Sequence, residues 1–373
     1  MRADAAERAR LERIGWATAG LVALASVPLV WFAPTWLAAL GLDPELLEAG
    51  EGYTRAMAVT LVPMLGVVLY RTLLTAAEKP KVFLKVTLAM LPLNAIGNWV
   101  LMTGPGPVPA LGPAGAGLST LLVASASLVL LAVIARRSAP PKLRDRPAPD
   151  WRGVATVLRV GLPIGIATLA EVGIFLAATL YAATLGAADV AAHTLTLRTA
   201  GVAYAVPAAL MQAAMVRVAR ADSLRNAELG RAVVASGLGL SLLAGALLFL
   251  VIAGGAEPLS QLFFNDGPAG LAAAGVAAGL LVMLGLMELI SGPGAVAAGL
   301  LRGQKDTRAP MLFGLLGHWA IGAPVGLVLC EAYDLGITGI WIGLTLGSAV
   351  TTALLLACLF SHRPSGPGQP LRP

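Results

Sequence analysis

The segment from Val160 to Leu185 reads VGLPIGIATLAEVGIFLAATLYAATL and decides the class of the fold. It is apolar throughout except for one carboxylic acid, Glu171, and a few small polar residues. A helix of about 20 apolar residues, rising about 1.5 Å per residue, crosses the ~30 Å hydrocarbon core of a bilayer. A barrel strand would instead alternate in polarity over about ten residues. The segment therefore predicts a membrane-spanning α-helix with an acid near its middle.

The rest of the chain has the same character. Of its 373 residues, 57% are hydrophobic and 12% are charged, and the mean hydropathy is +0.81. A soluble domain carries about one-quarter charged residues. The first apolar segment is too long for a cleaved signal peptide. We expect an all-α polytopic membrane protein with about ten transmembrane helices. The expected spans are approximately 14–36, 53–75, 82–103, 111–135, 156–185, 190–216, 232–254, 269–301, 310–330 and 336–360.

Lys and Arg lie in every second connection, and Asp and Glu lie in the connections between. The basic stretches are the N-terminal 13 residues, 71–85, 136–159, 217–231, 302–308 and the tail. The positive-inside rule then places both termini in the cytoplasm, as in a multi-pass protein of the inner cell membrane. The net charge of +6 and pI of about 9.7 are therefore a topology signal. Charges dispersed in this way do not indicate nucleic-acid binding.

An internal repeat divides the chain. The tripeptide Arg-Ala-Asp at 2–4 returns at 220–222, and Gly112 and Gly115 open a span as Gly336 and Gly339 do. Both copies place their basic connections on the same side, so the repeats are parallel. Four spans follow the first tripeptide and six belong to the second copy. We expect two further helices to precede the first copy in a complete protein.

These repeats predict two lobes of four and six helices. Residues 1–135 are expected to form an incomplete N-terminal lobe and residues 153–362 the C-terminal lobe. The stretch 136–152 is rich in Pro and basic residues and is typical of a cytoplasmic linker. Residues 363–373 are expected to be a disordered tail.

Ionisable side chains far from the helix ends are the first candidates for function, because each costs on the order of 2.5 to 3.5 kcal/mol in a membrane. Glu171 suits a group that alternately binds a proton, a metal cation or a cationic substrate. Glu288 is a second such acid, and Arg198 is a candidate counter-ion for either. His193 and His318 are candidate proton carriers. For Glu171 and the histidines a structural hydrogen bond is the alternative, and for Arg198 it is snorkelling to the outer surface.

Polar residues and prolines supply further candidates. Asn94 and Asn98 lie one turn apart on a helix face and offer carbonyl oxygens to an ion or substrate, or bonds to another helix. Pro163 and Pro293 are candidate hinges near the two acids. The sequence contains no catalytic constellation, so we expect a protein that is not an enzyme and needs no cofactor.

Three stretches carry a family resemblance. Residues 161–218 contain LPIG followed by EVG, then AAH at 191–193, and VP followed by VRV. The stretch AGLLRGQKDTRAPM at 298–311 and the later GITGIWIGL complete the pattern. Together they resemble the NorM-like branch of the multidrug and toxic compound extrusion (MATE) family. That family has twelve helices in two lobes around a central cavity and exports cationic drugs in exchange for Na⁺ or H⁺.

The resemblance also implies roles for individual residues. Glu171 matches an acid that takes part in cation or substrate binding, so Na⁺ at Glu171 is one alternative. The family's acid on its tenth helix falls here on Ser291. Asn94, Asn98 and Thr120 resemble the polar residues of the N-terminal ion site. Their acidic partner in the family's first helix has no counterpart in this chain.

We therefore expect a secondary antiporter that exchanges small cationic amphipathic substrates for Na⁺ or H⁺ in the lipid bilayer, working as a monomer. One alternative is a lipid or lipid-linked oligosaccharide flippase of the same superfamily, whose cavity would need basic residues. Another is an inactive truncated or partner-binding membrane protein.

Overall fold

The computed structural model describes residues 2–39, 44–76, 79–107, 109–137, 150–264 and 267–361. These residues form helices and connecting turns, and no strand occurs among them. Ten candidate membrane spans are present in this part of the chain, which confirms the predicted polytopic α-helical class. Their bounds agree with the predicted ranges to within about two helical turns.

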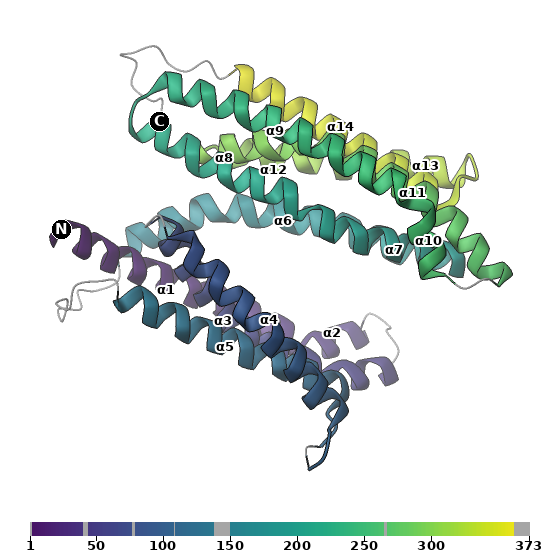
Figure 1. The fold of residues 1–373 in the computed structure, drawn as a ribbon, viewed down its shortest axis with the longest axis horizontal. Coiled ribbons are helices and arrows are strands. Elements are labelled where there is room, and N and C mark those ends of the chain that lie inside the picture. Colours follow the sequence, from purple (N-terminus) through teal and green to yellow (C-terminus); the bar gives the residue numbers. More distant parts are fainter. Residues whose placement is uncertain are drawn as a thin grey trace. The chain divides into compact units, whose positions relative to one another are not determined.

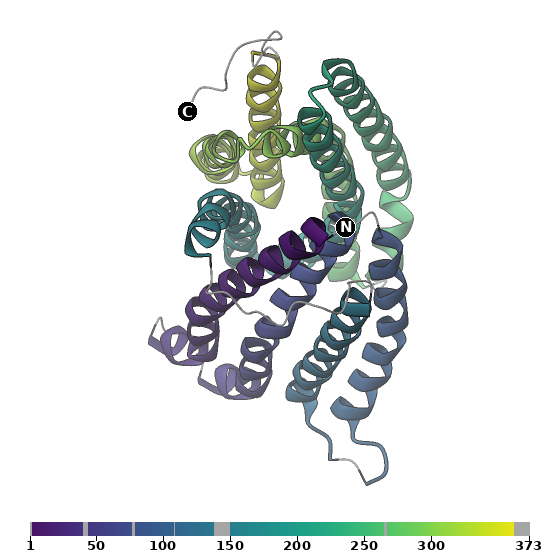
Figure 2. The ribbon, with the colours of Figure 1, turned by 90° about the vertical axis from the view of Figure 1, so that its left-hand side faces the viewer.

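The chain divides into two compact units, Met1–Leu158 and Arg159–Pro373. In the first unit α3 packs against both α1 and α5, and α4 packs against α5 (Figure 1). Figure 2 shows the helices of this unit in purple to blue. The elements of the first unit are α1 (Arg2–Trp31), α2 (Ala33–Ala39), α3 (Pro44–Ala76), α4 (Pro80–Thr103), α5 (Gly112–Arg137) and the first turns of α6 (Trp151–Leu185).

The second unit continues α6 and is built around α11. This helix lies against α7, α8, α9 and α14, and α13 packs on α14. The further elements are α7 (Ala187–Ala203), α8 (Ala205–Ser223), α9 (Ala227–Gly254), α10 (Ala256–Phe263), α11 (Pro268–Gly303), α12 (Arg308–Gly314), the π-helix η1 (Leu315–Gly322), α13 (Ala323–Glu331) and α14 (Gly336–Ser361). By contrast with α11, helix α6 makes few close backbone approaches to its neighbours.

The duplicated glycines have the same conformation in both copies. Gly112 and Gly336 each have a φ of +54°, in the left-handed region that glycine enters without strain, at the first residue of α5 and of α14. Three residues later, a Cβ on Gly115 would collide with the backbone of Leu101, and one on Gly339 with the backbone of Cys330. Each helix therefore starts at a left-handed glycine and then packs closely on the end of the preceding span.

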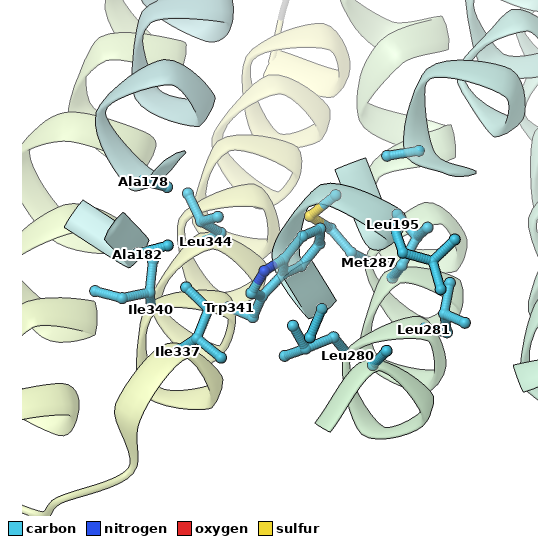
Figure 3. Packing of buried hydrophobic residues seen from close by; sticks show 14 of the residues in the cluster. Ala178, Ala182, Leu195, Leu280, Leu281, Met287, Ile337, Ile340, Trp341 and Leu344 are labelled. Carbon is cyan, nitrogen blue, oxygen red and sulfur yellow. The ribbon is translucent and has the colours of Figure 1, made fainter. Parts of the chain in front are cut away.

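The core of the second unit centres on Trp341, which is fully buried. Figure 3 shows its ring among Leu344 of α14, Leu280 and Met287 of α11, and Leu195 of α7. Lipid is as apolar as these side chains, so close packing rather than removal from water stabilises this cluster. It holds the helices that carry the candidate site in fixed positions.

Helix α6 begins at a cap formed by Asp150. Its Oδ1 accepts a hydrogen bond from the Gly153 N–H at 3.0 Å, and its Oδ2 accepts from Arg10 Nη2 at 2.6 Å. The Gly153 N–H, and then the Arg10 guanidinium, hold the pKa of Asp150 below its usual range. The start of α6 is thereby tied to α1. Residues 138–149 of the predicted linker and the tail after 361 lie outside the described residues, so the predicted domain boundaries stay predictions.

Candidate functional site

Glu171 lies near the middle of α6, and its side chain is exposed although other helices of the second unit surround it at longer range. The carboxyl interacts with the guanidinium of Arg302 and with the hydroxyl of Tyr204. Among the described residues, no ion pair within 4.0 Å joins Glu171 to Arg302. The acid therefore has polar neighbours but is not locked in a direct salt bridge.

Tyr204 owes its position to a break in the span that runs from Ala187 to Ser223. Helix α7 ends at Ala203 and α8 begins at Ala205, with Tyr204 between them. Pro207 lacks an N–H and cannot bond to the carbonyl of Ala203, which accounts for the interruption. The hydroxyl of Tyr204 interacts with both Glu171 and Arg302.

Arg302 lies in the last turn of α11 and is half-buried. Its Nη1 donates to the Met211 sulfur at 3.3 Å, while its buried Nε has no hydrogen-bond partner. Thioether sulfur is a weak acceptor, so the guanidinium is only partly satisfied within the protein. A cation in this state remains available to an acidic group such as Glu171.

Glu288 is the second acid and is 4% exposed. It interacts electrostatically with Glu171, and its buried Oε2 has no hydrogen-bond partner. The side chain lines a cavity of about 10 Å³, together with Pro207 of α8, Ser241 of α9 and other residues of α8, α9 and α11. A space of this size holds about one water molecule. Glu288 therefore lines a small, mainly apolar cavity between α8, α9 and α11.

The structure groups Glu171 and Glu288 but separates Arg198 from them. Arg198 is exposed on α7 and takes no part in the interactions of the two acids. Arg302 is the cation near Glu171 instead. Sequence reasoning missed it because it counted Arg302 with the basic connection 302–308, whereas α11 extends to Gly303. Tyr204 was missed as well. The signal in the sequence that could have found it is its position three residues before Pro207, in the middle of a span.

His193 is fully buried in a hydrogen-bond chain. Its Nδ1 accepts from the Trp341 indole at 3.2 Å, so its Nε2 carries the proton that the Thr179 hydroxyl accepts at 2.9 Å. The Thr179 hydroxyl in turn donates to the Phe175 carbonyl at 2.8 Å. These bonds satisfy a neutral imidazole at both nitrogens and link α6, α7 and α14.

The remaining candidates of the second unit are Ser291 and the two prolines. Ser291 lies about one turn beyond Glu288 on α11 and is half-buried. Pro293 is buried between glycines that contact α9 and α14. Pro163 lies between Gly161 and Gly165, around which a Cβ would find open space. The assignment of the prolines as hinges stays a prediction, and Pro163 has more room to move.

The polar residues of the first unit form a separate group. Asn98 Nδ2 donates to Asn94 Oδ1 at 3.4 Å, and the Ser119 hydroxyl donates to the Asn94 carbonyl at 3.3 Å. Thr120 donates to its own helix, at the carbonyl of Ala116. The buried Oδ1 of Asn98 has no partner. This group contains neutral acceptors, and its role in ion binding stays a prediction.

Acidic and phenolic side chains held at mid-span in a duplicated helical membrane protein are typical of secondary transporters. Comparison with known proteins agrees with this class. A family model described as MatE matches residues 7–100 and 163–328. A probable multidrug resistance protein NorM of Mesorhizobium japonicum is 34% identical over 346 residues, which cover 90% of this chain and 74% of that protein. A protein of the same name from Geobacillus kaustophilus is 30% identical, with coverage of 90% and 72%.

Solved structures show the same fold. The eukaryotic MATE transporter AtDTX14 superposes with a TM-score of 0.86 at 17% identity, over 96% of this chain and 79% of that one. A mutant of the Vibrio cholerae MATE transporter VcmN gives 0.79 at 17% identity, over 93% and 76%. The chain belongs to the MatE family. It is therefore a multi-pass membrane transporter and not an enzyme, and the resemblance found in its motifs is confirmed.

Proposed function

We propose that this chain is a secondary antiporter that exports cationic amphipathic compounds in exchange for Na⁺ or H⁺. The observation that carries the proposal is Glu171, an exposed acid at mid-span whose neighbours Tyr204 and Arg302 leave it without a direct salt bridge. The relatives named as multidrug resistance proteins support the export of drugs.

The exchange follows from the cost of leaving a carboxylate uncompensated away from water. A bound proton, Na⁺ or cationic substrate each neutralises Glu171, and only one of them does so at a time. Departure of one cation is therefore easier when another takes its place, which is the thermodynamic basis of antiport. Tyr204 offers a hydroxyl to whichever cation or carboxylate form is present, and Arg302 compensates part of the charge between occupants.

Other features fit a transporter of the inner cell membrane. The alternating basic connections support cytoplasmic termini, as the positive-inside rule predicts. Within the described residues, no cluster of three or more His, Cys, Asp or Glu side chains is placed to hold a metal, and the proposed cycle needs no cofactor. We propose that the working unit is a monomer, because each chain carries its own Glu171 group.

One observation favours a second function. A flippase for anionic lipids or lipid-linked oligosaccharides needs a basic group in its cavity, and the partly satisfied Arg302 beside Glu171 supplies one. The nearby acids Glu171 and Glu288 oppose an anionic headgroup at the same place. Cation export is therefore the better-supported function.

Transport in proteoliposomes tests both. The full chain should export a cationic dye such as ethidium when a Na⁺ or H⁺ gradient is imposed. Glu171→Gln should reduce export by about 10- to 100-fold, as expected for the loss of a charge-assisted interaction. Glu257→Gln, which changes an exposed acid on α10, is the matched control and should export at the parental rate. Parental export by Glu171→Gln contradicts the proposal, and translocation of a labelled anionic phospholipid without dye export supports the flippase.

A further inference from the structure

The π-helix η1 interrupts the span Arg308–Glu331. Short π-helical turns are rare and are frequent at functional sites, because they redirect side chains within a helix. On one side η1 packs against α14 through Gly317 and Gly322, where a Cβ would meet the carbonyls of Gly347 and Gly343 respectively. Gly317 and Gly322 are five residues apart, the spacing of the i→i+5 hydrogen bonds of a π-helix. His318 adds a contact of 3.2 Å between its Nε2 and the Ser348 hydroxyl.

Trp319 also lies between these two glycines in sequence, but its side chain contacts α6. Its indole N–H donates to the carbonyl of Ala170 at 2.9 Å. Its ring lies against Gly173, where a Cβ would be 3.4 Å from the ring. Ala170 and Gly173 flank Glu171 on α6. The π-helix therefore delivers one side chain to the single helical turn that carries the acid.

Few other contacts of this kind hold α6. Beyond the capped first turn, the described part of α6 between Val154 and Leu169 makes no hydrogen bond to another helix. The next bonds lie toward the other end, at Thr179 with His193 and at Tyr181 with Glu331. Trp319 thus marks the point at which α6, after the unpacked stretch around Pro163, becomes fixed to the second unit.

We propose that Trp319 is a positioning residue for Glu171: its indole holds the backbone of the Ala170–Gly173 turn, so that the carboxyl faces Tyr204 and Arg302. The inference rests on the proposed function of Glu171 as the exchange group. The Ala170 carbonyl has a second lone pair for this bond beyond the one used within the helix. Removing the bond should weaken binding of the cation while leaving the later steps of transport intact.

Trp319→Phe removes the N–H and keeps an aromatic ring. It should raise the apparent KM for ethidium by about fivefold, the scale of one hydrogen bond, with a maximal rate within about twofold of the parent. Trp99→Phe is the matched control, since Trp99 is 60% exposed on α4. Gly173→Val should displace the ring and raise KM in the same way. Gly275→Val, at a position with open space, should not.

Hydrogen exchange on the same proteins provides a readout that does not depend on transport. Amides of residues 171–175 should exchange faster in Trp319→Phe than in Trp99→Phe. An unchanged KM in Trp319→Phe, or a loss of maximal rate and melting temperature at constant KM, overturns the proposal. Unchanged exchange at 171–175 overturns it as well. If Glu171→Gln transports normally, the proposed function is wrong. The hydrogen-exchange data at residues 171–175 still decide whether Trp319 holds this turn.

Discussion

The two copies of the repeated hairpin share a backbone and differ in what lies between their helices. Helix α4 and the span Arg308–Glu331 are each 24 residues long and start 228 positions apart, so Asn94 corresponds to Gly322. At the glycine offset of 224, Ser119 corresponds to Gly343. In the first copy the Ser119 hydroxyl bonds to the Asn94 carbonyl, whereas in the second a Cβ on Gly343 would collide with the carbonyl of Gly322.

At these positions the first hairpin is therefore polar, whereas the second is closed by direct backbone contact. Asn98, whose Oδ1 lacks a partner, corresponds to Gly326, which packs on the backbone of Ile340. In the second unit the groups around Glu171 lie outside the hairpin, on α6, at the junction of α7 and α8, and on α11. The first copy of the hairpin is thus a candidate site of neutral oxygens. The second copy is a closely packed hairpin that contains η1.

The largest expected effect is on folding and comes from the closed hairpin. Gly343→Val would place side-chain atoms against the backbone of Gly322 and Gly326, which cannot yield without separating the helices. We expect a loss of about 3 kcal/mol or more, seen as a collapse of folded yield and melting temperature in detergent. Ser119→Ala, the change at the equivalent position of the polar hairpin, should cost about 0.5–1 kcal/mol. A parental melting temperature for Gly343→Val would show that the two hairpins do not differ in this way.

The next effect compares two of the buried side-chain atoms that lack hydrogen-bond partners, Glu288 Oε2 and Asn98 Oδ1. Glu288→Met replaces a buried acid by an apolar side chain of similar length, which should stabilise the protein by about 1–3 kcal/mol. Asn98→Leu should stabilise it by about 1 kcal/mol, because a neutral carbonyl oxygen costs less to bury. Thermal melting in detergent measures both changes.

If Glu288 contributes to the exchange of cations during transport, Glu288→Met should lose export although it gains stability. Asn98→Leu should keep most of its export. The opposite order of stabilities, or a destabilised Glu288→Met, would mean that an ordered water already satisfies Glu288 in its cavity. The export assay then decides whether the acid is retained for function.

The spans, the topology signal and the duplication could be predicted from sequence because each depends on local composition or spacing. Gly112 and Gly336 were recognisable as equivalents, and the structure gives them the same φ. Glu171 was recognisable from its depth in an apolar segment. These features require no knowledge of which helices are neighbours.

The partners of Glu171 could not be predicted in this way. By sequence, Arg198 lies within a span and Arg302 at the end of one, yet Arg302 is the cation that interacts with Glu171, because α11 packs against α7 and α8. Trp319 contacts Ala170 across 149 positions of sequence, through a π-helix that has no marker in its composition. The choice among candidate partners was thus set by tertiary packing.

The smallest effect compares two helix caps. Asp150 caps α6 in the first unit, and Asn226 caps α9 in the second, where its Oδ1 accepts from the Leu229 N–H at 2.9 Å. Only the carboxylate titrates. Because the native pKa of Asp150 lies below its unfolded value of about 3.9, its stabilisation is fully present above that value. It is lost as the pH falls through the lowered native pKa.

Asp150→Asn should therefore flatten the fall in melting temperature between about pH 6 and about pH 3 while changing little at neutral pH. Asn226→Asp is the reciprocal control and should add a pH-dependent component at the cap of α9. Because Asp150 is partly exposed and water screens its pairing with Arg10, each difference should amount to only a small shift in melting temperature. Superimposable curves for the parent and Asp150→Asn across that range would show that the carboxylate is not what distinguishes the two caps.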